Sequence, residues 1–131
     1  MLEGVRALTF DVFGTVVDWR SGVARDAAAI IGARGFDLDW GAFADRWRAL
    51  YQPSLERVRS GERPWTRLDD LHRESLLQVL NEFGLGQLPA DAIEELNRSW
   101  HRLDPWPEVV EALGRLKTRY ILATLSTAMY L

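Results

Sequence analysis

The chain has 131 residues, 47% of them hydrophobic, which is enough for one compact core or for one core with an inserted smaller unit. Its formal net charge is −3, with 16 basic and 19 acidic side chains mixed along the chain, and this argues against a nucleic-acid partner. No apolar run approaches the roughly 18 residues that span a membrane, and the sequence has no cysteine, so we expect a cytoplasmic protein without a membrane partner.

The first predicted element is a β-strand at about residues 5–11, where the chain is short, mostly apolar and β-prone. Such a run is typical of a strand that a parallel sheet buries on both faces. Asp11 ends the strand, and Gly14 and Thr15 follow it. A carboxylate therefore lies at the carboxyl edge of the sheet, where α/β proteins bind their ligands, and we predict that Asp11 takes part in chemistry.

Helical spacing of apolar residues predicts four helices next, without an intervening strand, at about 21–34, 39–58, 68–83 and 89–103. Asp39 is expected to cap the second of these helices, and Pro53 to kink or split it. Four consecutive helices do not belong in a doubly wound sheet. We therefore predict that residues 17–103 form an inserted helical cap with its own core.

After this insertion the chain is expected to return to the sheet. Pro107 is placed to open a fifth helix, and residues 120–125 read as a second buried strand. A strand, a long excursion, a helix and a second strand make a βαβ unit with an insertion. The predicted fold class is α/β, with the first half of a Rossmann-like parallel-sheet core at 1–16 and 104–131 and the four-helix cap at 17–103.

The motif D-x-F-G-T from Asp11 to Thr15 resembles the first motif of the haloacid dehalogenase superfamily, specifically of its 2-haloacid dehalogenase branch. The second strand, which ends at Ser126, resembles the second motif, although Thr127 stands where the branch usually carries asparagine. The resemblance implies that Asp11 is a nucleophile that forms a covalent ester with a small 2-haloacid, and that water then opens this ester. It also implies that Thr15 orients the ester or the water.

Phe13 decides between two reactions of this superfamily. Its phosphatases carry a second aspartate at this position, which gives a proton to the leaving alkoxide, and Phe13 cannot do so. A halide leaves as a stable anion, so Phe13 favours carbon–halogen cleavage, and no metal or other cofactor is expected. Phe13 is also expected to leave Asp11 in an apolar setting, where a poorly solvated carboxylate is a better nucleophile.

The resemblance assigns substrate or halide binding to Arg48, Ser126, Phe13 and Thr127. Arg48 lies in a W-R-x-x-Y segment where the branch carries an arginine that binds halide and carboxylate. The forked donors of a guanidinium suit a departing anion. The alternative is that Arg48 is a solvated helix arginine, and Arg20 is a lesser candidate for the same role.

The tryptophans and histidines of the helical segment have less distinctive patterns. Four tryptophans could line a pocket in the cap, but packing between helices is the expected role of most of them: Trp19, Trp40, Trp47 and Trp65. His72 and His101 fall within helical patterns and are expected to be surface or packing residues rather than bases.

The sheet-forming pieces, 1–15 and 104–131, supply only two strands, whereas a doubly wound domain takes on the order of 100–150 residues. The superfamily's third motif is a lysine later in the chain, and the only lysine here, Lys117, precedes the second strand. We therefore expect the N-terminal half of a dehalogenase. The alternatives are a non-catalytic cap and half-core that completes its sheet by forming a homodimer, and a superfamily phosphatase.

Overall fold

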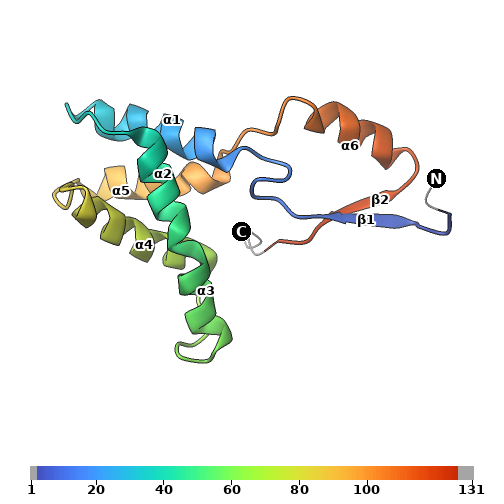
Figure 1. The fold of residues 1–131 in the computed structure, drawn as a ribbon, viewed down its shortest axis with the longest axis horizontal. Coiled ribbons are helices and arrows are strands. Elements are labelled where there is room, and N and C mark those ends of the chain that lie inside the picture. The colour runs from blue at the N-terminus through green and yellow to red at the C-terminus, as the bar shows by residue number, and fades with distance from the viewer. Residues whose placement is uncertain (1–2, 127–131) are drawn as a thin grey trace.

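The structure is a computed structural model that describes residues 3–126, and these form a helical part and a smaller sheet part joined by two linkers (Figure 1). The helical part contains α1 (Trp19–Gly32), α2 (Trp40–Ala49), α3 (Tyr51–Arg59), α4 (Leu68–Glu82), α5 (Ala90–Asn97) and the 3₁₀ turn η1 (Arg98–His101). The sheet part contains β1 (Ala7–Phe10), α6 (Val109–Lys117) and β2 (Ile121–Thr124). The chain leaves the sheet part after β1 and returns to it at α6.

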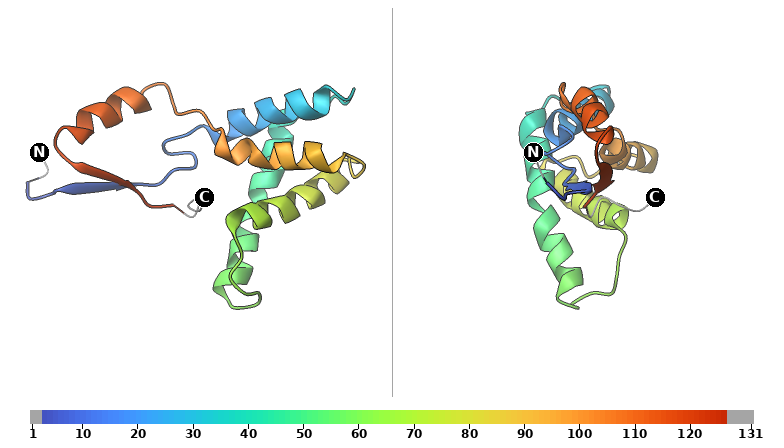
Figure 2. Two further views of the ribbon diagram at one scale, coloured as in Figure 1. Left: turned by 180° about the vertical axis from the view of Figure 1, so that it is seen from behind. Right: turned by 90° about the vertical axis from the view of Figure 1, so that its right-hand side faces the viewer.

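The two strands are parallel neighbours, with Ala7 opposite Ile121 and Phe10 opposite Thr124. Helix α6 leads into β2 and lies along one side of the strands (Figure 2), so the sheet part is the predicted βαβ unit. The prediction that the first strand is buried on both faces is wrong, since Thr9 is exposed. Within residues 3–126 no helix other than α6 contacts the strands, and the opposite face is left uncovered.

Side chains at the helix ends explain where several helices begin and stop. The Asp18 side chain accepts a hydrogen bond from the Ser21 amide at 3.1 Å and caps α1, and Asp39 accepts one from the Ala42 amide at 2.9 Å and caps α2. Helix α4 ends just before Gly84, whose φ of 74° is a left-handed conformation that glycine adopts at low cost. The hydrogen bond from the Ala42 amide confirms the prediction that Asp39 caps the second helix.

The predicted second helix is split in two. Helix α2 ends at Ala49 and α3 begins at Tyr51, so the helical part has five α-helices rather than four. Pro53 explains the break, because its ring has no N–H and would collide with the carbonyl group of residue 49 in a continuous helix.

The helical part has a hydrophobic core of its own. Helix α1 packs against α2 and α5, and α4 packs against α3 and α5. The apolar side chains with essentially no exposed surface are Val23, Ala27, Ile31, Phe43, Ala44, Trp47, Leu76, Val79, Leu80 and Leu96. Burying a large apolar side chain contributes about 1.5–3 kcal/mol, so this set is a substantial source of stability. Helix α6, in contrast, contains no buried residue.

The two linkers lie side by side between the two parts. The Asp18 amide donates to the Asp104 carbonyl at 2.9 Å, and the Trp106 amide donates to the Val16 carbonyl at 3.1 Å. The indole Nε1 of Trp106 also donates to the Gly14 carbonyl at 3.1 Å. The returning linker is therefore fastened to the turn that follows β1.

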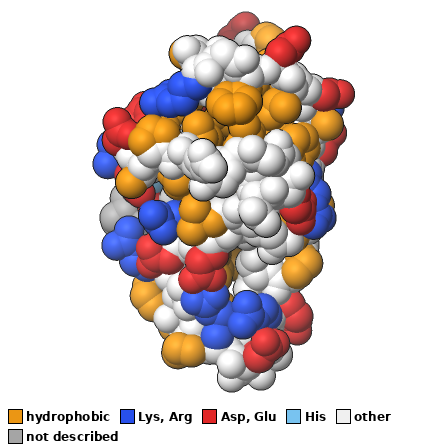
Figure 3. All heavy atoms as spheres, turned by 90° about the vertical axis from the view of Figure 1, so that its left-hand side faces the viewer, with side chains coloured by type: hydrophobic (Ala, Val, Ile, Leu, Met, Phe, Trp, Pro, Cys, Tyr) orange, Lys and Arg blue, Asp and Glu red, His pale blue; other side chains and the backbone are white. Residues whose placement is uncertain are grey.

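The outer surface of the helical part carries charges of both signs. Figure 3 shows basic and acidic side chains intermixed on this end of the molecule. Arg46 and Glu82 are one pair, with Nε and Nη2 of the arginine 2.7 and 2.8 Å from the two carboxylate oxygens. Within residues 3–126, no helix is both long and apolar enough to cross a membrane.

Candidate active site

Asp11 follows β1 directly, at the carboxyl edge of the sheet. Thr15 Oγ1 donates a hydrogen bond to Asp11 Oδ2 at 2.9 Å. The turn between them is closed by three successive amides, from Thr15 onwards, that donate to the Val12 carbonyl at 3.0–3.2 Å. Gly14 has a φ of 87°, which a residue with a Cβ rarely adopts. The turn thus fixes the Asp11 carboxylate through the hydroxyl of Thr15.

Asp11 is exposed in the structure, so the expectation of an apolar setting around its carboxylate is wrong for the described residues. The physical reason is that the ring of Phe13 points into the helical part and does not cover the Asp11 carboxylate. Phe13 packs into the helical part, with ring centroids 5.4 Å from Trp100 and 6.4 Å from Tyr51. It therefore anchors the turn and leaves Asp11 open to solvent.

Ser126 lies just beyond β2, at the same edge of the sheet as Asp11. The Leu125 amide donates to the Phe10 carbonyl at 2.8 Å, so the ladder continues past the end of both strands. The carboxyl ends of both strands point towards the helical part (Figure 1). The backbone thus brings the two motif segments together. Thr127 lies outside the described residues.

Arg48 belongs to the helical part, yet its side chain lies beside the turn after β1. Its guanidinium carbon is 4.0 Å from the ring centre of Tyr51, 5.2 Å from that of Phe13 and 5.6 Å from that of Trp19. Nη1 is buried and makes no hydrogen bond within residues 3–126. Arg48 is therefore held by aromatic rings and is not the solvated helix arginine of the alternative interpretation.

Residues from both parts of the molecule affect the pKa of Arg48. Burial lowers the pKa of the Arg48 guanidinium from its ordinary value, while Tyr51 and the negative charge of Asp11 act to raise it. An arginine keeps its proton at neutral pH under such conditions. The charge of the candidate nucleophile thus acts on a ring-bound cation across the junction between the two parts.

The aromatic cluster continues from Phe13 into the helical core. The imidazole of His72 stacks on Trp100, with ring centroids 4.5 Å apart and an angle of 18° between the planes. His72 is 4% exposed, and neither of its ring nitrogens has a hydrogen-bond partner within residues 3–126. Burial, and after it the charge of Arg48, lowers the pKa of His72 to about 3, so the ring is neutral at physiological pH.

The other residues singled out from the sequence lie elsewhere. Arg20 donates from Nε and Nη2 to the two oxygens of Asp45 at 2.8 and 3.0 Å, and this exposed pair links α1 to α2. Trp47 is buried in the core, Trp40 is half-buried and Trp65 is 70% exposed. Among the four tryptophans named from the sequence, Trp19 is the one whose ring lies against Arg48.

Sequence reasoning missed the positions of Tyr51, His72 and Trp100 beside the site. All three follow the helical spacing of core residues, and that spacing is the same for a ring that packs in the core and for one that lines a site. The W-R-x-x-Y segment offers a signal for Tyr51, because it lies three residues after Arg48. No comparable signal exists for His72 or Trp100, which reach the cluster from α4 and η1.

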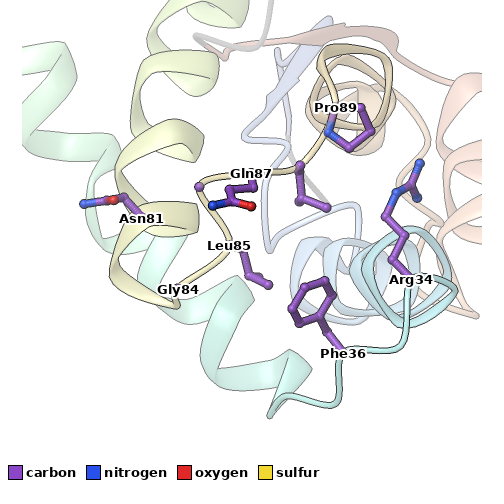
Figure 4. Close-up of a pocket in the computed structure, with 9 residues that line it drawn as sticks. Arg34, Phe36, Asn81, Gly84, Leu85, Gln87 and Pro89 are labelled. Atoms are coloured by element: carbon purple, nitrogen blue, oxygen red, sulfur yellow. The ribbon is translucent and has the colours of Figure 1, made fainter.

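A pocket of about 750 Å³ (Figure 4) lies between the α1–α2 and α4–α5 connections, at the end of the helical part that points away from the sheet part (Figure 1). Its lining includes Arg34, Phe36, Leu85, Gln87 and Pro89, and it contains none of the candidate site residues. The guanidinium of Arg34 donates to a backbone carbonyl of α1 at 2.6 Å. Because the pocket brings no nucleophile near a cation, the candidate site is at the junction and not here.

No protein-family model matches the chain, and no curated protein matches it either. Solved structures do match. One is a defluorinating L-2-haloacid dehalogenase, 48% identical, with a TM-score of 0.89, over 93% of this chain and 51% of the other. A second L-2-haloacid dehalogenase is 44% identical, with a TM-score of 0.87, over 95% of this chain and 53% of the other.

The L-2-haloacid dehalogenase of Xanthobacter autotrophicus is 24% identical, and with a TM-score of 0.76 over 94% of this chain and 46% of the other it shows a shared fold. The chain therefore spans about half the length of the solved structures that it matches.

Proposed function

This chain belongs to the haloacid dehalogenase superfamily and corresponds to about half of an L-2-haloacid dehalogenase, and we propose that it carries the nucleophile of a hydrolase that cleaves the carbon–halogen bond of small 2-haloacids. The main support is one observation. The Thr15 hydroxyl holds the Asp11 carboxylate through a hydrogen bond of 2.9 Å, and Asp11 lies close enough to Arg48 for the negative charge of Asp11 to act on the guanidinium. On this proposal residues 17–103 are the cap, and 1–16 with 104–131 belong to the core.

The proposed reaction has two steps. A carboxylate oxygen of Asp11 attacks C2 of the haloacid, and the carbon–halogen bond breaks with its electron pair leaving on the halide. Water then adds to the ester carbonyl and releases the 2-hydroxy acid, the carboxylate of Asp11 is restored, and one proton passes to solvent. No step is assigned to a metal or other cofactor.

Each of the other candidate residues has a separate proposed part. Thr15 orients the Asp11 carboxylate, and Arg48 holds the departing halide or the substrate carboxylate. Ser126, at the carboxyl edge of the sheet, and Thr127 bind the substrate. Phe13 holds Arg48 beside the nucleophile, and it cannot supply the proton that a phosphate ester would need.

Substitution of Asp11 by Asn is the direct test. We expect halide release from 2-chloropropionate to be abolished with the helical circular dichroism unchanged, because the amide keeps the shape and loses the nucleophile. A single turnover in ¹⁸O-water should place one ¹⁸O in the peptide that contains Asp11, as read by mass spectrometry. The assay uses this chain alone and this chain with the other half of the defluorinating relative supplied as a separate polypeptide.

Thr15→Val is the matched control, since it removes only the hydrogen bond to Asp11. It should slow halide release and still give the ¹⁸O label. Halide release by the Asp11→Asn chain, or turnover without label in Asp11, would contradict the covalent mechanism.

A second candidate, a self-associating module in the cytoplasm, is supported by apolar side chains left open in the sheet part. Val110 and Leu125 are each 71% exposed, and Ile121 is 70% exposed. Exposed apolar side chains beside unpaired strand edges invite pairing with a second copy. Sedimentation velocity should then show a homodimer that Ile121→Lys converts to monomer. A monomeric wild-type chain that releases halide would argue against this candidate.

A further inference from the structure

His72 is a buried imidazole with an unused donor. Its ring is enclosed by aromatic neighbours, with centroids 4.5 Å from Trp100, 5.9 Å from Tyr51, 6.3 Å from Trp47 and 6.5 Å from Phe13. A neutral imidazole carries one N–H donor and one acceptor nitrogen, and residues 3–126 provide a partner for neither. Buried polar groups in folded proteins are nearly always hydrogen-bonded, so this one needs an explanation.

Arg48 also has a buried N–H donor without a hydrogen-bond partner within residues 3–126, and it lies beside the same aromatic rings. Its Nη1 is buried without a hydrogen-bond partner within residues 3–126, and its guanidinium lies against Phe13 and Tyr51, the two rings that His72 also contacts. The charge of Arg48 acts on His72, and the charge of Asp11 acts on Arg48. Two unused N–H donors, one cationic and one neutral, thus flank one aromatic cluster next to the nucleophile.

We propose that His72 is a second halide-binding residue, whose N–H donates to the departing halide together with Nη1 of Arg48. This inference rests on the proposed function and adds to it a specificity-determining contact from α4. The halide would lie among Phe13, Tyr51 and Trp100, whose ring edges carry partial positive charge and favour a soft, spherical anion.

The arrangement suits a halide better than a carboxylate. A carboxylate is best held by two parallel donors of one guanidinium fork, whereas a spherical ion accepts single donors from separate directions. A neutral imidazole also matches the chemistry, because the halide needs a hydrogen bond and no proton. His72 is therefore assigned to binding of the leaving group and not to general-base catalysis.

The test is a titration of this chain with sodium bromide, with the histidine ring ¹H and ¹⁵N signals followed by NMR. The His72 signals should shift and saturate, and those of the exposed His101, 2.8 Å from Asp69, should not. Sodium sulfate at matched ionic strength should have no effect. Sodium acetate is the arm that identifies a carboxylate subsite, and a saturable His72 shift with acetate but not with bromide would overturn the assignment.

Two substitutions complete the test. His72→Phe keeps the stacking on Trp100 and removes the N–H, so bromide affinity, measured from bromide line broadening, should fall about tenfold, as for loss of one hydrogen bond to a charged group. His72→Gln keeps a donor and should recover part of this affinity, and Arg48→Met should abolish saturable binding. His101→Gln is the matched control and should bind bromide like the wild type.

Unshifted His72 signals throughout the wild-type titration, or unchanged affinity in His72→Phe, would overturn the inference. The wild-type titration needs no substituted chain, so it remains decisive if a variant fails to fold. It also needs no turnover. A chain that forms the Asp11 ester without a bromide response at His72 contradicts this inference alone, and a bromide response without the ester contradicts the proposed function alone.

Discussion

Phe13 connects the two parts of the molecule through a single side chain. It is two residues from Asp11 in the sequence, but its ring belongs to the cluster that includes Trp100 and Tyr51. The guanidinium of Arg48 lies 5.2 Å from the centre of the same ring. The position of the cation relative to the nucleophile therefore depends on how Phe13 packs.

His72 should make stability depend on pH. Its pKa is about 3 in the folded chain against an ordinary value of 6.5, so between these values the unfolded chain binds a proton that the folded chain does not. The free energy of unfolding therefore falls as the pH drops from 6.5 towards 3, by about 1.4 kcal/mol per pH unit from this group. Urea denaturation of the wild type and of His72→Phe at a series of pH values measures it.

In His72→Phe this contribution is absent, so the wild-type chain should lose more stability than the variant on acidification. The carboxylates that lose their ion pairs in acid are common to both proteins and cancel in the comparison. Parallel curves of unfolding free energy against pH would show that His72 takes up its proton in the folded chain at its ordinary pKa.

At the scale of elements, the cap of α2 matters because this helix carries Arg48. Asp39 satisfies the Ala42 amide at 2.9 Å, and Asp39→Ala should lower the free energy of unfolding by about 0.5–2 kcal/mol. Asp37→Ala is the matched control, since Asp37 is an exposed carboxylate in the same loop. Thermal or urea unfolding of the two variants measures the difference. Equal losses of unfolding free energy would mean that the removal of a negative charge, and not the loss of the cap, destabilises the chain.

Local chemistry explains which elements were predictable from the sequence. The cap at Asp39 and the disruption at Pro53 each depend on a residue and its near neighbours, and the structure has both. The aromatic site was not predictable, because His72 and Trp100 reach Phe13 through packing of helices that are far apart in the sequence. The exposure of Asp11 was not predictable for the same reason, because it depends on the packing of the Phe13 ring against the helical part.

At the scale of the whole molecule, stability is unevenly distributed. The helical part contains the buried core, whereas α6 has no buried residue and Ile121 of β2 is 70% exposed. Amide hydrogen exchange should therefore be slowest in α1, α2 and α4 and much faster in β1, β2 and α6.

Addition of the other half of the defluorinating relative is the control for this experiment. It should slow exchange in the strands and leave the helices unchanged. Strands that are as protected as the helices in the chain alone would show that two strands and one helix form a stable unit.

The paired linkers have a consequence for the order of folding. Pairing of β1 with β2 closes a loop that contains the entire helical part, and closing a long loop slows folding. The hydrogen bonds of Asp18 to Asp104 and of Trp106 to Val16 bring the two ends of that loop together. Once the helices have folded, the strands have only a short distance left to search, so we expect strand pairing to be a late and rapid step.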